Sequence, residues 1–184
     1  MAIRRYKPTS PGRRNMATSA FDDITGLPLL MLPEGFRYLS FGWTGDPMID
    51  GTPTPGAHDG MAALYWRGQR VRLVRNHELS TGTPFAAVAY DSASAGGTTT
   101  IEFDQKTGEY VGTAASLSGT VRNCAGGPTL WGSWLTGEET TAFTTATGPP
   151  HGYVFDEPAD GTGDPLNRCA TWAASLTRPW PSTT

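Results

Sequence analysis

The chain has 184 residues, enough for one domain with a sizeable hydrophobic core. Its formal net charge of −3 argues against nucleic acid as the general partner of this domain, and no apolar run is long enough to cross a bilayer. Gly (23) and Pro (15) are frequent, whereas charged residues make up only 17% of the chain. This composition favours many turns and short strands over long helices.

The first 26 residues differ in character from the rest. Residues 1–14 carry five basic side chains and no acidic one: Arg4, Arg5, Lys7, Arg13 and Arg14. Two prolines and a glycine prevent a continuous helix here, so we expect an extended, irregular basic arm that suits nucleic-acid phosphates. Residues 1–25 closely resemble the N-terminus of the universal second protein of the large ribosomal subunit. We therefore interpret residues 1–26 as foreign to the domain or disordered.

Residues 27–165 carry patterns that are typical of a mainly β domain. Apolar and basic residues alternate in 71–75, as they do in a half-buried strand. Further candidate strands are 98–103, 110–111, 131–135 and 152–155, with a tight turn at 105–108. Short strands separated by Gly, Pro, Asp and Thr suit a propeller or a barrel, and no strict internal repeat is visible.

The most informative segment is 123–139, which reads Asn-Cys-Ala-Gly-Gly-Pro-Thr-Leu-Trp-Gly-Ser-Trp-Leu-Thr-Gly-Glu-Glu. Cys124 lies in a glycine-rich turn, and the pair Glu138–Glu139 ends the following strand. A soft thiolate beside hard carboxylates suits iron, with calcium held by oxygen alone. Neighbouring residues of a strand point to opposite faces, so one glutamate can enter a site while the other faces away. The alternatives are a disulfide with Cys169, inert thiols, and a solvated acidic turn.

Weaker site candidates lie before this segment. Glu78 is a second-rank metal ligand, because a lone carboxylate at a strand end is more often structural. Five further residues are candidates for lining the site: Asn123, Asn76, His77, His58 and Asp59. The alternative for the two histidines is a purely structural role, and the segment 58–60 alternatively only organises a turn.

The chain from about Leu32 to Asp156 resembles the PhoX-type alkaline phosphatases. The matching segments follow one another in the family's order: 32–38, 44–48, 50–61, 71–78, 90–91, 96–104, 116–120, 123–139 and 151–155. So many segments in one order make a strong signal.

The resemblance implies a metal-dependent phosphatase that hydrolyses small phosphate monoesters through an iron and calcium cluster. It implies that Cys124 is an iron ligand and that at least one of Glu138 and Glu139 binds metal, while no catalytic side chain is assigned. It also implies an incomplete β-propeller-like fold with the first blades only. The family draws further ligands and basic residues from later blades, so we expect little or no activity from this chain alone.

The sequence also gives expectations for the cellular location of the chain and for its last residues, 166–184. The family is typically exported to the periplasm or the cell exterior, but neither arginine pair, Arg4–Arg5 or Arg13–Arg14, precedes an apolar stretch, so the location of this polypeptide stays open. Residues 166–184 show no clear period, and our hypothesis for them is an aberrant tail after a frameshift near Asn167. The alternative functions are an RNA-associated ribosomal-type protein, acting through the basic arm, and an inert metal- or phosphate-binding fragment.

Overall fold

The computed structural model describes residues 2–5, 17–141, 147–158 and 160–161. These residues form strands paired into antiparallel sheets, so the prediction of a mainly β chain is confirmed. None of the described segments is a helix that could cross a membrane. The chain divides into two compact units, Met1–Trp43 and Thr44–Thr184, and the expected aberrant tail at 166–184 lies outside the described residues.

The described residues of the first unit form two strand pairs. Strand β1 (Ala2–Arg5) pairs with β4 (Phe36–Leu39), and β2 (Ala17–Ala20) pairs with β3 (Leu30–Pro33). The expectation of an irregular arm is therefore wrong for β1 and β2. Even without an alternating side-chain pattern, an extended segment can satisfy its backbone groups by pairing with a strand edge. Lys7, Arg13 and Arg14 lie outside the described residues.

Tyr38 organises the small core of this unit. Its side chain is completely buried, and its hydroxyl donates to the carbonyl oxygen of Leu27 at 2.8 Å and accepts from the amide of Leu29 at 2.8 Å. These bonds tie the segment that leads into β3 to strand β4. The first compact unit ends at Trp43 and so includes residues 27–43 together with the described part of the arm.

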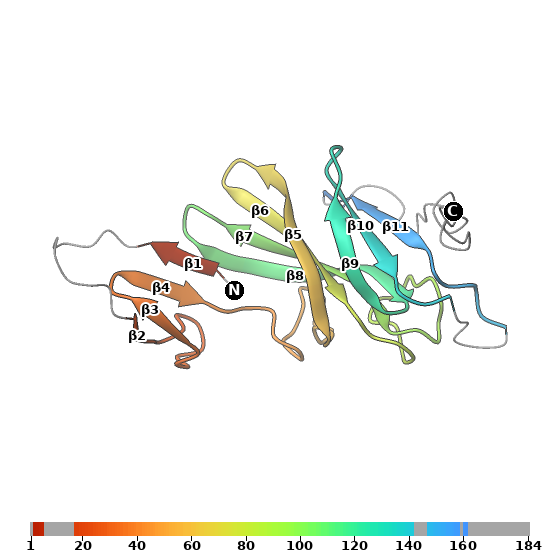
Figure 1. Cartoon of the computed structure of the whole chain (residues 1–184), viewed down its shortest axis with the longest axis horizontal. Coiled ribbons are helices and arrows are strands. Elements are labelled where there is room, and N and C mark those ends of the chain that lie inside the picture. Colours follow the sequence, from red (N-terminus) through yellow and green to blue (C-terminus); the bar gives the residue numbers. More distant parts are fainter. Residues whose placement is uncertain (1, 6–16, 142–146, 159, 162–184) are drawn as a thin grey trace, which may run out of the picture. The chain divides into compact units, whose positions relative to one another are not determined.

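The second unit begins with a four-stranded antiparallel sheet (Figure 1). Its strands follow the chain order: β5 (His58–Arg67), β6 (Arg70–His77), β7 (Gly96–Asp104) and β8 (Glu109–Thr120). The strands expected at 71–75, 98–103 and 110–111 lie in β6, β7 and β8, and the turn at 105–108 joins the last two. The segment 58–60, for which organising a turn was the alternative, is the start of β5.

A three-stranded antiparallel sheet also belongs to the described part of the second unit. It consists of β9 (Asn123–Pro128), β10 (Ser133–Glu138) and β11 (Val154–Pro158), in the order β11-β10-β9. Two local predictions need correction. Cys124 lies in strand β9 and not in a turn, because the glycine-rich run pairs with β10, and Trp131 lies in the turn before β10.

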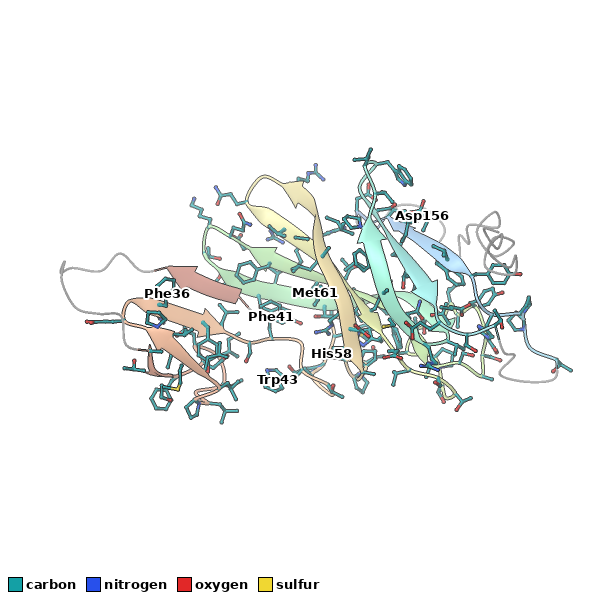
Figure 2. All side chains as sticks on the ribbon, in the orientation of Figure 1. Phe36, Phe41, Trp43, His58, Met61 and Asp156 are labelled. Carbon is teal, nitrogen blue, oxygen red and sulfur yellow. The ribbon has the colours of Figure 1, made fainter. Side chains whose placement is uncertain are left out.

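The two sheets of this unit share a buried core. Val74 of β6 and Trp134 of β10 are buried against each other, and Ala62 and Leu64 of β5 pack on them. Strands β5 and β9 run beside each other at this junction. Figure 2 labels His58 and Met61 on β5. His58 is the first residue of this strand, and Asp59 is the second. The core therefore fixes the start of β5 against β9.

Candidate metal centre

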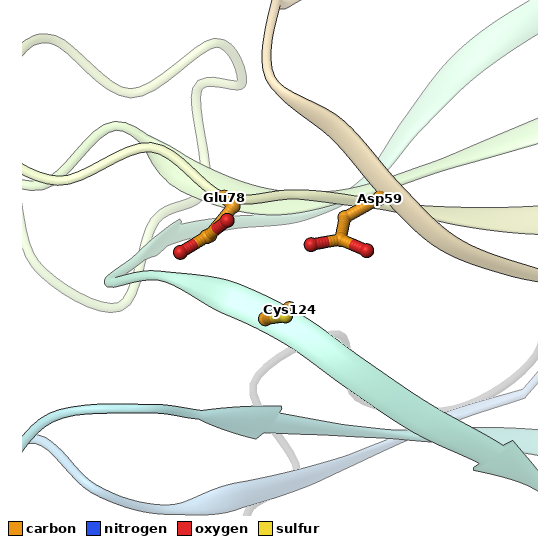
Figure 3. Close-up of side chains that lie close together, drawn as sticks. All are labelled: Asp59, Glu78 and Cys124. Carbon is orange, nitrogen blue, oxygen red and sulfur yellow. The ribbon is translucent and has the colours of Figure 1, made fainter.

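Three ligand-type side chains meet where β5, β6 and β9 come together. Asp59 belongs to β5, Glu78 follows the last residue of β6, and Cys124 belongs to β9. The ligand atoms of these residues all lie within 4.8 Å of one another. Figure 3 shows the two carboxylates facing Cys124 from neighbouring segments of the chain. Asp59 is exposed and the other two are half-buried, so a solute can reach the cluster.

Glu139 adds a third carboxylate to this cluster. Hydrogen bonds to the carboxylates of Asp59 and Glu139, together with partial desolvation, raise the pKa of the Cys124 thiol to about 12. The thiol therefore stays protonated at neutral pH while no cation is bound between it and these carboxylates. A bound cation would reverse this balance, since a coordinating thiol loses its proton outright. This donor set of one sulfur and several oxygens fits a metal ion.

Glu138 and Glu139 point in different directions, as the strand alternation predicts. Both oxygens of Glu138 accept hydrogen bonds: Oε1 from the amide of Val121 at 2.9 Å, and Oε2 from the amides of Gly152 at 2.7 Å and Tyr153 at 3.1 Å. His151 Nδ1 also lies 2.7 Å from Oε1. Glu138 is thus a buried structural carboxylate, and Glu139 is the member of the pair that reaches Cys124.

Arg122 is a charged neighbour of the cluster that the sequence analysis did not single out. Its guanidinium lies 3.4 Å from a carboxylate oxygen of Glu78 and 3.7 Å from one of Glu139. Its backbone has φ 53°, a left-handed conformation that is uncommon for an arginine. The signal in the sequence was its place two residues before Cys124, at the start of the motif.

Asn76 and Asn123 make hydrogen bonds to protein groups around Cys124, so their side chains are not directed at a metal ion in the described geometry. Asn76 is fully buried, and its Nδ2 donates to the carbonyl oxygens of Cys124 at 2.7 Å and Ala125 at 3.2 Å. Asn123 accepts from the hydroxyl of Thr120 and donates to that of Thr136 at 3.0 Å. Both asparagines therefore hold the backbone of β9 in place.

The two candidate histidines make local hydrogen bonds. His77 Nδ1 donates to the carbonyl oxygen of Gly56 at 2.8 Å, so its Nε2 accepts from the hydroxyl of Thr99 at 2.9 Å. Burial lowers the pKa of His77 to about 4, which keeps the ring neutral. His58 Nε2 donates to the carbonyl oxygen of Pro55 at 2.8 Å. These bonds give both rings a structural role in holding the loop before β5.

Comparison with known proteins agrees with the resemblance seen in the sequence. The family described as "Alkaline phosphatase PhoX" matches residues 13–116 and 106–165, which together include most of each unit and all four members of the cluster around Cys124. No solved structure matches the chain.

Proposed function

The chain belongs to the PhoX family of alkaline phosphatases, and on this premise we propose that it is a metal-dependent phosphatase domain acting on phosphate monoesters. One observation carries the proposal: the thiol of Cys124 and the carboxylates of Asp59 and Glu78, from three separate segments, have their ligand atoms within 4.8 Å of one another at the junction of the two sheets. The carboxylate of Glu139, from a fourth segment, lies beside the thiol. Gathering these carboxylates costs energy, because like charges repel one another and the single guanidinium of Arg122 does not balance them. A shared cation offsets that cost.

We assign the donors by their chemistry. The sulfur of Cys124 suits iron, and the carboxylates of Asp59, Glu78 and Glu139 suit both iron and calcium. Bound iron and calcium would stabilise the negative charge on the phosphoryl oxygens of the ester. Asn76 and Glu138 have positioning roles, since one holds the backbone of Cys124 and the other holds the segment before it.

The two sheets of the second unit suit neighbouring blades of a propeller. A propeller blade is a four-stranded antiparallel sheet, and β5 to β8 form such a sheet in chain order. The sheet β11-β10-β9 would be the inner part of the next blade. In that arrangement the metal centre lies between two blades, where each contributes ligands.

The described residues bring four donor groups and one guanidinium to the site. Calcium alone takes six to eight oxygen ligands, so these donors do not saturate an iron and calcium cluster. We therefore expect the chain by itself to bind metal but to hydrolyse esters slowly. Fast turnover would contradict this last expectation and leave the family assignment intact.

The test is metal uptake and ester hydrolysis by the whole chain. After reconstitution with iron and calcium, the wild type should retain both metals and show slow, metal-dependent hydrolysis of a chromogenic phosphate monoester. Cys124→Ser should lose iron and activity together. Cys169→Ser, which changes the other cysteine, is the matched control and should behave as the wild type. Equal metal content and equal rates in all three proteins would refute the proposal.

A further inference from the structure

Arg122 places a cationic side chain at the rim of the candidate metal centre. Its guanidinium lies within ion-pair distance of Glu78 and Glu139, two of the proposed ligands. The side chain is 48% exposed, so a dissolved anion can reach it without a rearrangement of the fold. Its planar set of N–H donors matches the oxygens of a phosphate group better than an ammonium does.

The charges of the cluster indicate when this guanidinium becomes available. Without metal, the carboxylates of Asp59, Glu78 and Glu139 outnumber the single charge of Arg122, so the guanidinium is held by its neighbours. When cations occupy the same carboxylates, the excess of negative charge disappears. Like charges then disfavour the guanidinium beside the metal unless an anion joins them. A phosphoryl group is the anion that the proposed reaction supplies.

The backbone of Arg122 is fixed from several sides in a conformation that costs energy. A left-handed φ, 53° at Arg122, is strained for a residue other than glycine and persists only when its surroundings enforce it. Here the amide of Arg122 donates to the carbonyl oxygen of Leu79 at 2.7 Å, and its carbonyl oxygen accepts from the amide of Glu139 at 3.2 Å. Glu138 holds the preceding amide of Val121. The fold thus fixes the backbone from which this side chain extends at the rim of the cluster.

We propose that Arg122 binds the phosphoryl oxygens of the substrate beside the metal centre, exchanging its ion pairs with Glu78 and Glu139 for the phosphate. This inference rests on the proposed function, because it needs metal on those carboxylates. It assigns the substrate contact to a residue two positions before Cys124, so that metal ligand and phosphate ligand are carried by one short segment.

The test is calorimetric titration of inorganic phosphate into the full chain loaded with iron and calcium. Arg122→Asn removes the guanidinium with a residue that tolerates a left-handed backbone, and Arg122→Lys keeps the charge without the fork of donors. We expect phosphate affinity to fall about tenfold or more in Arg122→Asn and by less in Arg122→Lys. We also expect unchanged metal content in both variants, and weaker phosphate binding by the metal-free wild type.

Arg70→Asn is the matched control. Arg70 is 53% exposed and is paired with Glu102, but it begins β6, roughly 25 Å of extended strand away from Glu78. It should bind phosphate as the wild type does. Equal phosphate affinity in Arg122→Asn and wild type, at equal metal content, would overturn the role of Arg122 alone. A wild type that takes up no metal would refute the proposed function, and the role of Arg122 would fall with it.

Discussion

The side-chain nitrogen of Asn76, Nδ2, lies 2.7 Å from the carbonyl oxygen of Cys124. The fully buried side chain of Asn76, near the end of β6, therefore holds the backbone of Cys124, the proposed iron ligand in β9. The side-chain oxygen of Asn76, Oδ1, accepts from Trp134 Nε1 at 2.8 Å and from the hydroxyl of Thr136 at 2.9 Å. Asn76 therefore joins the two sheets at the point where the cluster forms, with donors and acceptors of its amide all engaged.

Replacing Asn76 by alanine should destabilise the domain strongly. The change leaves the indole of Trp134 and the carbonyl oxygen of Cys124 buried without their partner, at a cost of about 1–3 kcal/mol for each unsatisfied group. Urea unfolding measures the loss, which we expect to reach about 3 kcal/mol. Gln69→Ala, in the exposed turn between β5 and β6, is the control and should change the free energy of unfolding by no more than about 0.5 kcal/mol.

Gly60→Ala tests the close approach of β5 to β9. A Cβ atom at this position would lie 2.7 Å from the carbonyl oxygen of Cys124, so one of the strands must move. We expect a loss of about 1–3 kcal/mol in unfolding free energy and weaker iron binding in a metal titration. Gly127→Ala, in β9 itself, meets nothing within 4 Å and should leave both properties unchanged. Wild-type iron affinity in Gly60→Ala would show that the spacing of these strands is irrelevant to the site.

The neighbouring glutamates should separate stability from metal binding. Glu138→Gln replaces an oxygen that accepts buried hydrogen bonds, so unfolding free energy should fall by about 2 kcal/mol or more. Glu139→Gln alters a partly exposed carboxylate, and it should change stability by about 0.5 kcal/mol at most while lowering metal content. Thermal unfolding and metal analysis of both variants give the comparison. Reversed outcomes would place Glu138 at the metal.

Glu157 should make the stability of the domain depend on pH. Burial, with a contribution from the charge of Asp156, raises the pKa of Glu157 from 4.5 to about 8. The folded state therefore keeps a proton that the unfolded state releases. The contribution of this protonation to the free energy of unfolding is fully present below pH 4.5 and is lost as pH rises toward 8.

The expected slope is on the order of 1 kcal/mol per pH unit within this window. Urea unfolding between pH 5 and 8 measures it. Glu157→Gln should remove much of the slope and be more stable than the wild type at the upper end. Parallel pH profiles for the two proteins would contradict this assignment.

The strands with clear side-chain periodicity could be predicted from the sequence. The alternation in 71–75 and the β-branched run in 98–103 mark β6 and β7, which lie at the centre of the four-stranded sheet. β1 and β9 could not be predicted in this way. The first is basic and the second is rich in glycine, and both are strands because a partner strand is available, which local sequence does not reveal.

The site was predictable only in part, because local sequence does not reveal tertiary contacts. The motif pointed to Cys124 and to one of two glutamates, but only tertiary contacts determine that Glu139 reaches the thiol and that Glu138 is enclosed by backbone amides. Asp59 was expected only to line the site, although it lies among the ligand atoms. Arg122 was missed, because its importance comes from ion pairs with residues distant in sequence, such as Glu78.

X-ray absorption at the iron edge of the reconstituted chain tests the central claim most directly. We predict sulfur in the first coordination shell of iron in the wild type and in Cys169→Ser, together with oxygen from carboxylates. In Cys124→Ser the sulfur should be replaced by oxygen or nitrogen. A wild-type spectrum without sulfur, or one that is unchanged by Cys124→Ser, would contradict the account.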